Sequence, residues 1–262
     1  MPTLETVLAA LQRVAPLELA AEWDNTGLLI EPRGRRRRVG RIVLCIDLAE
    51  RVAIEAERAG ADLVVAYHPT IFQPLRRLDI GDGKQRAVLH AARAGFAVYS
   101  PHTALDAVDG GIADWLADGV LAGDEAKERR PCGDGDYGRV VELPRAIPLS
   151  RLLQRMKRAL RQKHLQVARP DTGPSSVRRV AVAAGAGGSI LRGEAADVFV
   201  TGEMSHHEAL AAVATGTSVV LAGHSNTERG YLPLLRRRLR RELGAEVDIR
   251  IARSDRDPFA IV

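Results

Sequence analysis

Short apolar runs alternate with longer amphipathic stretches along the chain, a pattern typical of alternating strands and helices. Apolar runs rich in β-branched residues predict strands buried on both faces at residues 41–46, 62–66 and 96–99. Segments with apolar residues on one helical face predict helices at residues 3–14, 50–59, 84–94 and 111–121. Repeated strand–helix alternation predicts an α/β protein with mostly parallel sheets.

The same alternation continues through the second half of the chain. Further strands are predicted at residues 139–143, 165–168, 179–184, 197–201, 218–222 and 247–252, and helices at residues 149–161, 204–214 and 228–243. Loops are predicted at residues 32–38 and 170–176. The polar, glycine-containing segment 124–137 is the best linker, so we predict two α/β domains, residues 1–125 and 126–262.

Polar side chains follow several of the predicted strands at the point where each strand ends. His68 follows one such strand, His102 and Asp106 follow the next, and His224 and Glu228 follow a third. In open α/β sheets, ligands bind at the edge where the carboxyl ends of the strands meet. The spacing of four residues between a histidine and an acid occurs twice, and it places both groups on one face of a helix. Imidazole and carboxylate ligands suit Zn, Fe, Mn, Co or Ni.

Each of these patterns also has a plainer interpretation. His68 can hydrogen-bond to a neighbouring loop, and His102 with Asp106 can mark the start of a helix. The segment with Glu203, His206 and His207 can supply metal ligands, outer partners or proton shuttles, or it can be a polar helix N-terminus. The glycine-rich loop at residues 185–189 can hold an anion through its N–H groups or form a tight turn.

Composition narrows the class of protein. The 262 residues suffice for one large domain or two modest ones. Two cysteines cannot build a disulfide framework, and none lies among the histidines, which disfavours a structural zinc site. No run approaches the roughly 20 apolar residues that span a bilayer. We therefore expect a cytoplasmic protein that does not contact membranes.

Arginine accounts for nearly all of the positive charge, and the formal net charge is +5. Basic clusters at residues 35–38 and 236–241 raise the question of nucleic-acid binding. In the second cluster, however, leucines fall at helical spacing and the arginines point outward. No aromatic residues interleave with the arginines, as single-strand binders usually require. Nucleic acid is therefore an unlikely partner.

Six stretches of the chain together resemble the Nif3-like family, also called the GTP cyclohydrolase I type 2 homologues. They run in order from Glu22 to Leu232 and read EWDNTGLLI, AYHPTIF, SPHTALDAVDGG, AGAGGS, TGEMSHHEAL and GHSNTERGYL. The resemblance implies a Nif3-like fold, in which two α/β domains enclose an interdomain cleft with a dinuclear metal centre. It also implies assembly into a toroidal homohexamer.

The family's metal ligands fall on His68, Asp106, His224 and Glu228 of this chain. Tyr67 stands where many bacterial members have another histidine, so the second of the two metal positions is the one in question. A tyrosine phenolate can serve there, or His102 or His206 can replace the missing ligand. The resemblance thus implies one or two divalent metal ions per chain.

Together, the residues and the resemblance predict a metal-dependent hydrolase that acts on a phosphate- or nucleotide-like substrate. Glu228, His206, His207 and His102 are the expected catalytic groups, the histidines because their ordinary pKa suits proton transfer near neutral pH. The alternative is a non-enzymatic hexameric regulator, interaction partner or metal carrier.

Overall fold

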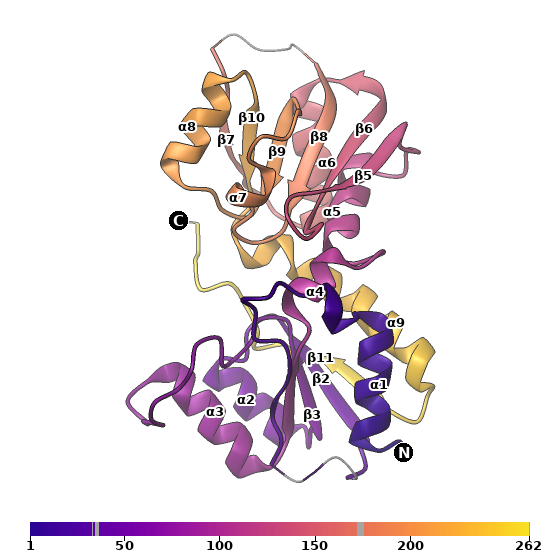
Figure 1. The fold of residues 1–262 in the computed structure, drawn as a ribbon, viewed down its shortest axis with the longest axis vertical. Coiled ribbons are helices and arrows are strands. Elements are labelled where there is room, and N and C mark those ends of the chain that lie inside the picture. The colour runs from indigo at the N-terminus through magenta and orange to yellow at the C-terminus, as the bar shows by residue number, and fades with distance from the viewer. Residues whose placement is uncertain (33, 35–36, 172–175, 262) are drawn as a thin grey trace. The chain divides into compact units, whose positions relative to one another are not determined.

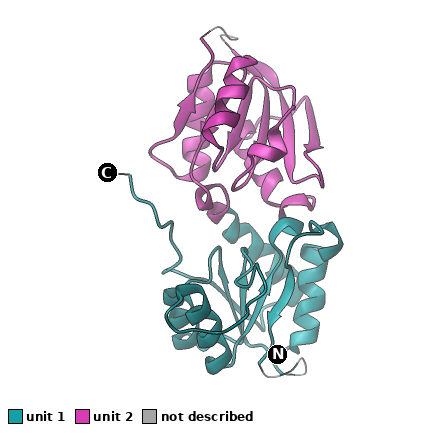
Figure 2. Cartoon of the chain, turned by 60° about the vertical axis from the view of Figure 1, so that its left-hand side comes forward, with its two compact units in different colours: residues 1–105, 231–262 teal, residues 106–230 magenta. Residues whose placement is uncertain are grey.

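The computed structural model describes residues 1–32, 34, 37–171 and 176–261. The chain forms two compact units (Figure 2). Unit 1 comprises Met1–Leu105 together with Tyr231–Val262, and unit 2 comprises Asp106–Gly230. Each unit has its own β-sheet, which confirms the α/β class with two sheets.

Unit 1 contains a five-stranded sheet in the order β1-β4-β3-β2-β11 (Figure 1). The strands are β1 (Gly27–Ile30), β2 (Arg41–Cys45), β3 (Leu63–Ala66), β4 (Ala97–Ser100) and β11 (Asp248–Ile251). The pairings among β11, β2, β3 and β4 are parallel, and only β1 pairs antiparallel, with β4. This sheet is therefore mostly parallel, and its central strands are as apolar as burial on both faces demands.

Four helices cover the two faces of the sheet in unit 1. They are α1 (Leu4–Val14), α2 (Glu50–Arg58), α3 (Gly83–Ala94) and α9 (Leu232–Leu243). Helices α2 and α3 pack together on one face, and α1 packs with α9 on the other (Figure 1). Val43, Val64 and Val98 form a core with Val52 of α2 and Ala91 of α3.

Unit 2 contains a six-stranded sheet in the order β5-β6-β8-β9-β10-β7. The strands are β5 (Glu128–Cys132), β6 (Gly138–Ile147), β7 (Gln166–Ala168), β8 (Val177–Ala183), β9 (Val198–Thr201) and β10 (Ser218–Leu221). Strands β8, β9 and β10 are parallel to one another, whereas the pairings of β5, β6 and β7 are antiparallel. The second sheet is thus mixed rather than mostly parallel.

The helices of unit 2 are α5 (Ile112–Leu121), α6 (Leu149–Leu160), α7 (Gly188–Leu191) and α8 (His206–Ala214). Helices α5 and α6 pack together, and α5 lies against β6 and β8. The short α7 contacts β8, and α8 contacts β10. Helix α4 (His102–Ala107) carries the chain from unit 1 into unit 2.

The two units do not coincide with the predicted domains, residues 1–125 and 126–262. The chain returns to unit 1 after Gly230, because β11 pairs with β2 and α9 packs on α1. The predicted linker 124–137 contains β5, an edge strand that pairs with β6 and is too polar to look like a strand in the sequence. Hydrophobic patterning alone does not reveal the pairing of β11 with β2, because it joins residues far apart in the chain.

Helix α9 begins later than predicted, at Leu232, with Pro233 in its first turn. Two 3₁₀ turns, η2 (Ser225–Thr227) and η3 (Arg229–Tyr231), precede it. Proline is tolerated only in the first turn of a helix, so its position limits where α9 starts. The predicted loops 32–38 and 170–176 lie partly outside the described residues. Within the described ranges, no helix has both the length and the apolar character needed to cross a bilayer.

A buried ion pair fastens α5 to the sheet of unit 2. Arg139 of β6 donates from Nε and Nη2 to the two carboxylate oxygens of Asp114, at 3.0 and 3.1 Å. Arg139 is 3% exposed and Asp114 is 8% exposed. Planar, two-pronged pairing of this kind satisfies both charges where water cannot.

Replacing Arg139 with methionine should destabilise unit 2 by about 3 kcal/mol, because it leaves the buried Asp114 carboxylate without its main counter-charge. Urea unfolding followed by the fluorescence of Trp115, which lies on α5, measures the change. Arg151→Met on α6 is the matched control, because Arg151 is exposed. Equal urea midpoints for Arg139→Met and the control would contradict the role given to this pair.

Candidate metal centre

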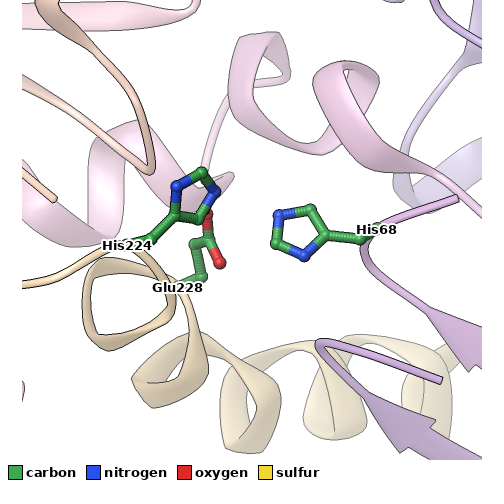
Figure 3. A group of neighbouring side chains, drawn as sticks. All are labelled: His68, His224 and Glu228. Carbon is green, nitrogen blue, oxygen red and sulfur yellow. The ribbon is translucent and has the colours of Figure 1, made fainter. Parts of the chain in front are cut away.

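In unit 2, the chain places an imidazole beside a carboxylate directly after β10. His224 Nε2 lies 3.3 Å from Glu228 Oε1. Figure 3 shows the Glu228 carboxylate beside the His224 ring. The other ring nitrogen of His224, Nδ1, lies 3.1 Å from Glu203 Oε2. Glu228 is only 1% exposed, so its charge requires compensation.

Glycines at the ends of neighbouring strands make room for this pair. Gly185 follows β8 with a φ of +56°, and a Cβ there would lie 2.8 Å from Glu228 Oε1 and 2.9 Å from His224 Nε2. Gly202 follows β9, and a Cβ there would lie 2.8 Å from the Cα of His224. Only glycine fits where backbone and functional side chains approach so closely.

Backbone hydrogen bonds of the glycine-rich loop distinguish between its two interpretations, an anion site and a tight turn. The Gly185 N–H donates to Thr227 Oγ1 at 2.9 Å, and the Gly187 N–H donates to Thr201 Oγ1 at 3.0 Å. Both groups therefore bind side chains of unit 2. The loop acts as a tightly packed turn, and it lends no support to an anion site.

In unit 1, His68 follows β3 and has its own carboxylate neighbour. His68 Nδ1 lies 2.9 Å from Oδ1 of Asp47, which follows β2. A neutral imidazole that donates from Nδ1 keeps the lone pair of Nε2 for a ligand. Figure 3 also labels His68, the unit 1 member of the predicted ligand set. This contact with the loop after β2 fits both interpretations of His68, as a loop contact and as an oriented ligand.

His102 is held in the same manner. It is the first residue of α4, with a φ of 29°, and its Nδ1 lies 2.8 Å from Asp24 Oδ1. The hydroxyl of Thr103 donates to the other oxygen of Asp24. Burial alone would raise the pKa of Asp24, but the hydrogen bonds from His102 and Thr103 outweigh it and lower the pKa. Asp24 therefore stays ionised, and its stabilising effect is lost only as the pH falls through this lowered pKa.

Tyr67 is buried beside both histidines of unit 1. Its ring centroid lies 4.9 Å from that of His68 and 5.4 Å from that of His102. The two imidazole centroids are 5.5 Å apart. The phenol thus occupies space next to His68, and within unit 1 the His102 ring adjoins both.

The remaining predicted site residues fall on α4 and α8. Asp106 is 8% exposed and lies one helical turn after His102 on α4. His206 and His207 begin α8, where Ser205 and Glu208 form a capping box. The two rings are exposed, with centroids 5.5 Å apart. His207 lines a cavity of about 960 Å³, and His206 lines a smaller groove. Of the interpretations of this segment, the polar helix N-terminus is the one that the capping box matches.

Two carboxylates that orient histidines were absent from the predicted set. Asp47 ends an apolar run in the same way as His68, so the rule that found His68 also indicates Asp47. Asp24 lies in the polar turn before β1, 78 residues from His102. No local pattern links residues so far apart, and only the sheet pairing of β1 with β4 brings them together.

Comparisons with known proteins agree with this fold. The family Duf34/NIF3 (NGG1p interacting factor 3) matches residues 2–258. The chain belongs to the Duf34/NIF3 family. A Schizosaccharomyces pombe protein named "Protein NIF3 homolog" is 44% identical over 224 residues, covering 82% of this chain and 81% of its own length. A Drosophila melanogaster protein named "NIF3-like protein 1" is 38% identical, covering 99% of this chain and 89% of its own.

Solved structures share the fold. Reduced HcgD from Methanocaldococcus jannaschii superposes with a TM-score of 0.84 at 24% identity, covering 96% of this chain and 98% of that chain. The resemblance stated from the six sequence stretches is thereby confirmed for family and fold. At 24% identity, this likeness shows the fold alone.

Replacing Gly185 with alanine should weaken metal binding by about 10-fold or more, the scale seen when groups that orient metal ligands are changed. The added Cβ would meet the Glu228 carboxylate and the His224 ring, and the residue would keep a left-handed φ that alanine disfavours. Metal titration followed by calorimetry measures the effect. Gly193→Ala is the control, because Gly193 has a similar φ of +82° but open space around its Cβ position. Equal losses in both variants would mean that backbone strain, not crowding of the ligands, is responsible.

Proposed function

We propose that this protein binds one or two divalent metal ions and uses them to hydrolyse a phosphate- or nucleotide-like substrate. The observation that carries the proposal is the pair His224 Nε2 and Glu228 Oε1, 3.3 Å apart. Two ligands of one tetrahedral ion, each about 2.1 Å from it, lie about 3.4 Å from each other. The pair therefore has the separation of two ligand atoms that share an ion.

The hydrogen bonds of the imidazoles support the same proposal. His68, His102 and His224 each present Nδ1 to a carboxylate, from Asp47, Asp24 and Glu203 respectively. Metal-ligating histidines almost always have such a neighbour, because it fixes the tautomer and raises the basicity of the ligating nitrogen. All three carboxylates belong to the same unit as the histidine that they orient.

We propose His68, His224 and Glu228 as the principal ligands, each offering one ligand atom, with Asp106 as a fourth. Neutral nitrogen and anionic oxygen donors without thiolate suit Zn, Fe, Mn, Co or Ni. For a second ion, His102 is the substitute for the histidine that Tyr67 replaces, because Asp24 already orients its ring. A divalent metal bound by this set supplies Lewis acidity.

The surroundings of His68 suit a small-molecule substrate. A cavity of about 540 Å³ in unit 1 is lined by His68, His102, apolar side chains such as Phe72 and Val88, and the ammonium of Lys84. A mostly apolar pocket with a few polar groups is the usual form of a ligand site. In this proposal His102 moves protons when one ion is bound and holds the second ion when two are bound, because its ring lines the pocket. His206 and His207 remain a further proposed proton relay.

The second candidate function is a non-enzymatic regulator, interaction partner or metal carrier. The family's description as an interacting factor favours it. The same ligand set would then hold an ion without turnover. The two candidates share the metal centre and differ only in whether a substrate reacts there.

The double replacement His224→Ala with Glu228→Ala should abolish metal binding, because it removes two of the three ligands proposed from unit 2 and leaves only Asp106 there. Elemental analysis after mild purification should find one to two ions per wild-type chain and none at this site in the variant. Asp47→Asn should weaken binding by about 10- to 100-fold, since it only disorients His68. Asp134→Asn, at an exposed aspartate, is the control. An unchanged metal content in the double variant would remove the proposal.

Hydrolysis is tested by screening the metal-loaded protein against phosphoesters, nucleotides and cyclic amides. Any turnover should require metal and fall by at least about 100-fold in His102→Gln, the scale lost with a general acid–base group. Metal content of that variant, measured in parallel, separates lost proton transfer from lost metal. If no substrate reacts faster than with the metal-free protein, the hydrolase gives way to the regulator or carrier.

A further inference from the structure

A second cavity, of about 960 Å³, lies wholly within unit 2 and is lined in part by residues of α7 and α8. Figure 1 labels both helices. Its apolar lining comes from Phe199, Met204, Ala211 and Ala212. Charged side chains surround this apolar surface, namely Glu142, Arg178, Arg179, Arg192, Glu194, Asp197 and Glu208. The volume falls within the range of small-molecule sites. Of the residues proposed for the metal centre, His207 lines this cavity, but neither His224 nor Glu228 does, so the cavity does not contain the proposed ligands of unit 2.

The carboxylates of the cavity are already engaged by protein donors. Asp197 accepts the backbone N–H groups of Arg178 and Arg179 at 2.6 and 2.8 Å. Glu194 pairs with Arg130, and Glu208 accepts from Arg192 and from the Ser205 hydroxyl. Each of these acids therefore already has at least one protein hydrogen-bond donor.

Two arginines of the cavity, Arg178 and Arg179, share a single carboxylate. Arg178 Nε and Arg179 Nη2 each donate one bond to Glu142, at 3.3 Å, and Lys127 Nζ donates to the same carboxylate at 2.7 Å. Three cations thus share one anion. The hydrogen bond from Lys127, more than those from the arginines, lowers the pKa of Glu142 to about 2. Each arginine has five N–H donors and gives one of them to Glu142, and the two side chains are 43% and 42% exposed.

A distortion of the sheet explains why two neighbouring arginines reach one carboxylate. Successive side chains of a regular strand point to opposite faces. The register of β6 with β8 shifts between Glu142 and Ile147, a β-bulge or irregularity beside Arg178. Bulges re-aim side chains, and here both guanidinium groups line the same cavity.

We propose that this cavity binds a phosphorylated small molecule that carries a flat apolar group. Arg178 and Arg179 bind the phosphate, because adjacent guanidinium forks match its oxygens in two-pronged pairs. The apolar group lies against Phe199 and the alanines of α8, where ring stacking adds to burial. The site is distinct from the metal centre, so the proposal holds whether or not the protein is a hydrolase.

The test uses the full chain, stripped of metal with EDTA, and adenosine 5′-diphosphate as the probe in titration calorimetry. We expect saturable binding of the diphosphate and none of adenosine. Arg178→Gln with Arg179→Gln should weaken binding by at least about 10-fold, since two charge-assisted contacts are lost. Glu142→Gln should strengthen binding, because the competing carboxylate becomes neutral.

Two controls locate the binding. Arg151→Gln with Arg158→Gln removes the same charge from exposed positions of α6 in unit 2 and should leave the affinity unchanged. His224→Ala with Glu228→Ala should also bind the probe normally, which separates this cavity from the metal centre. Equal losses in the two arginine pairs would reduce the effect to overall charge and overturn the site. Pyrophosphate binding as tightly as the diphosphate would overturn the part assigned to the apolar lining.

Discussion

The crowding at the ends of the parallel strands of unit 2 is the constraint on which the candidate centre depends. Strands β8, β9 and β10 each lead into a glycine, and a Cβ on Gly185 or Gly202 would collide with the backbone or side chain of His224. Backbone hydrogen bonds hold the three glycine turns together. The Glu203 N–H donates to Gly185 O, and the Gly223 N–H donates to Gly202 O. Parallel strands bring their carboxyl ends to one edge, and side chains can fill that edge only where the backbone leaves space. The buried Glu228 carboxylate therefore has its position because Gly185 carries no Cβ, and the turn that bears His224 can pack there because Gly202 carries none.

Orientation of the imidazoles is the second requirement, and each unit meets it with its own residues. Asp47 and Asp24 hold His68 and His102 within unit 1, while Glu203 holds His224 within unit 2. A carboxylate against Nδ1 favours the tautomer that leaves the lone pair on Nε2, the nitrogen that would bind a metal ion in the proposed centre. Ligands prepared in this way lose less side-chain freedom on binding than mobile ones, which raises affinity without an added contact.

Sequence reasoning found the candidate ligands because their signal is local. His68 and His224 each follow an apolar run, and the spacing of His224 and Glu228 repeats that of His102 and Asp106. The residues that orient them were missed, or left among several options, because their partners lie 21 to 78 residues away. The strands and helices were likewise predicted near their observed positions. The pairing of β11 with β2 in the sheet of unit 1 was not predicted, because the sequence of a four-residue strand does not indicate which strand it pairs with.

Strand β8 separates the two sites of unit 2. Arg178 and Arg179 lie at its beginning and line the proposed anion cavity, whereas Gly185 follows its end and packs on the His224–Glu228 pair. A strand rises about 3.3 Å per residue, so the six residues from Arg179 to Gly185 separate the sites by about 20 Å. Substitutions that far apart, with no shared contacts, have additive effects. Val180, Ala181 and Val182 lie between the two ends and are buried. An effect of charge at one end on the other end must therefore pass through the packed sheet. Each site can therefore be removed while the other is measured, and coupling between them would itself reveal movement along β8.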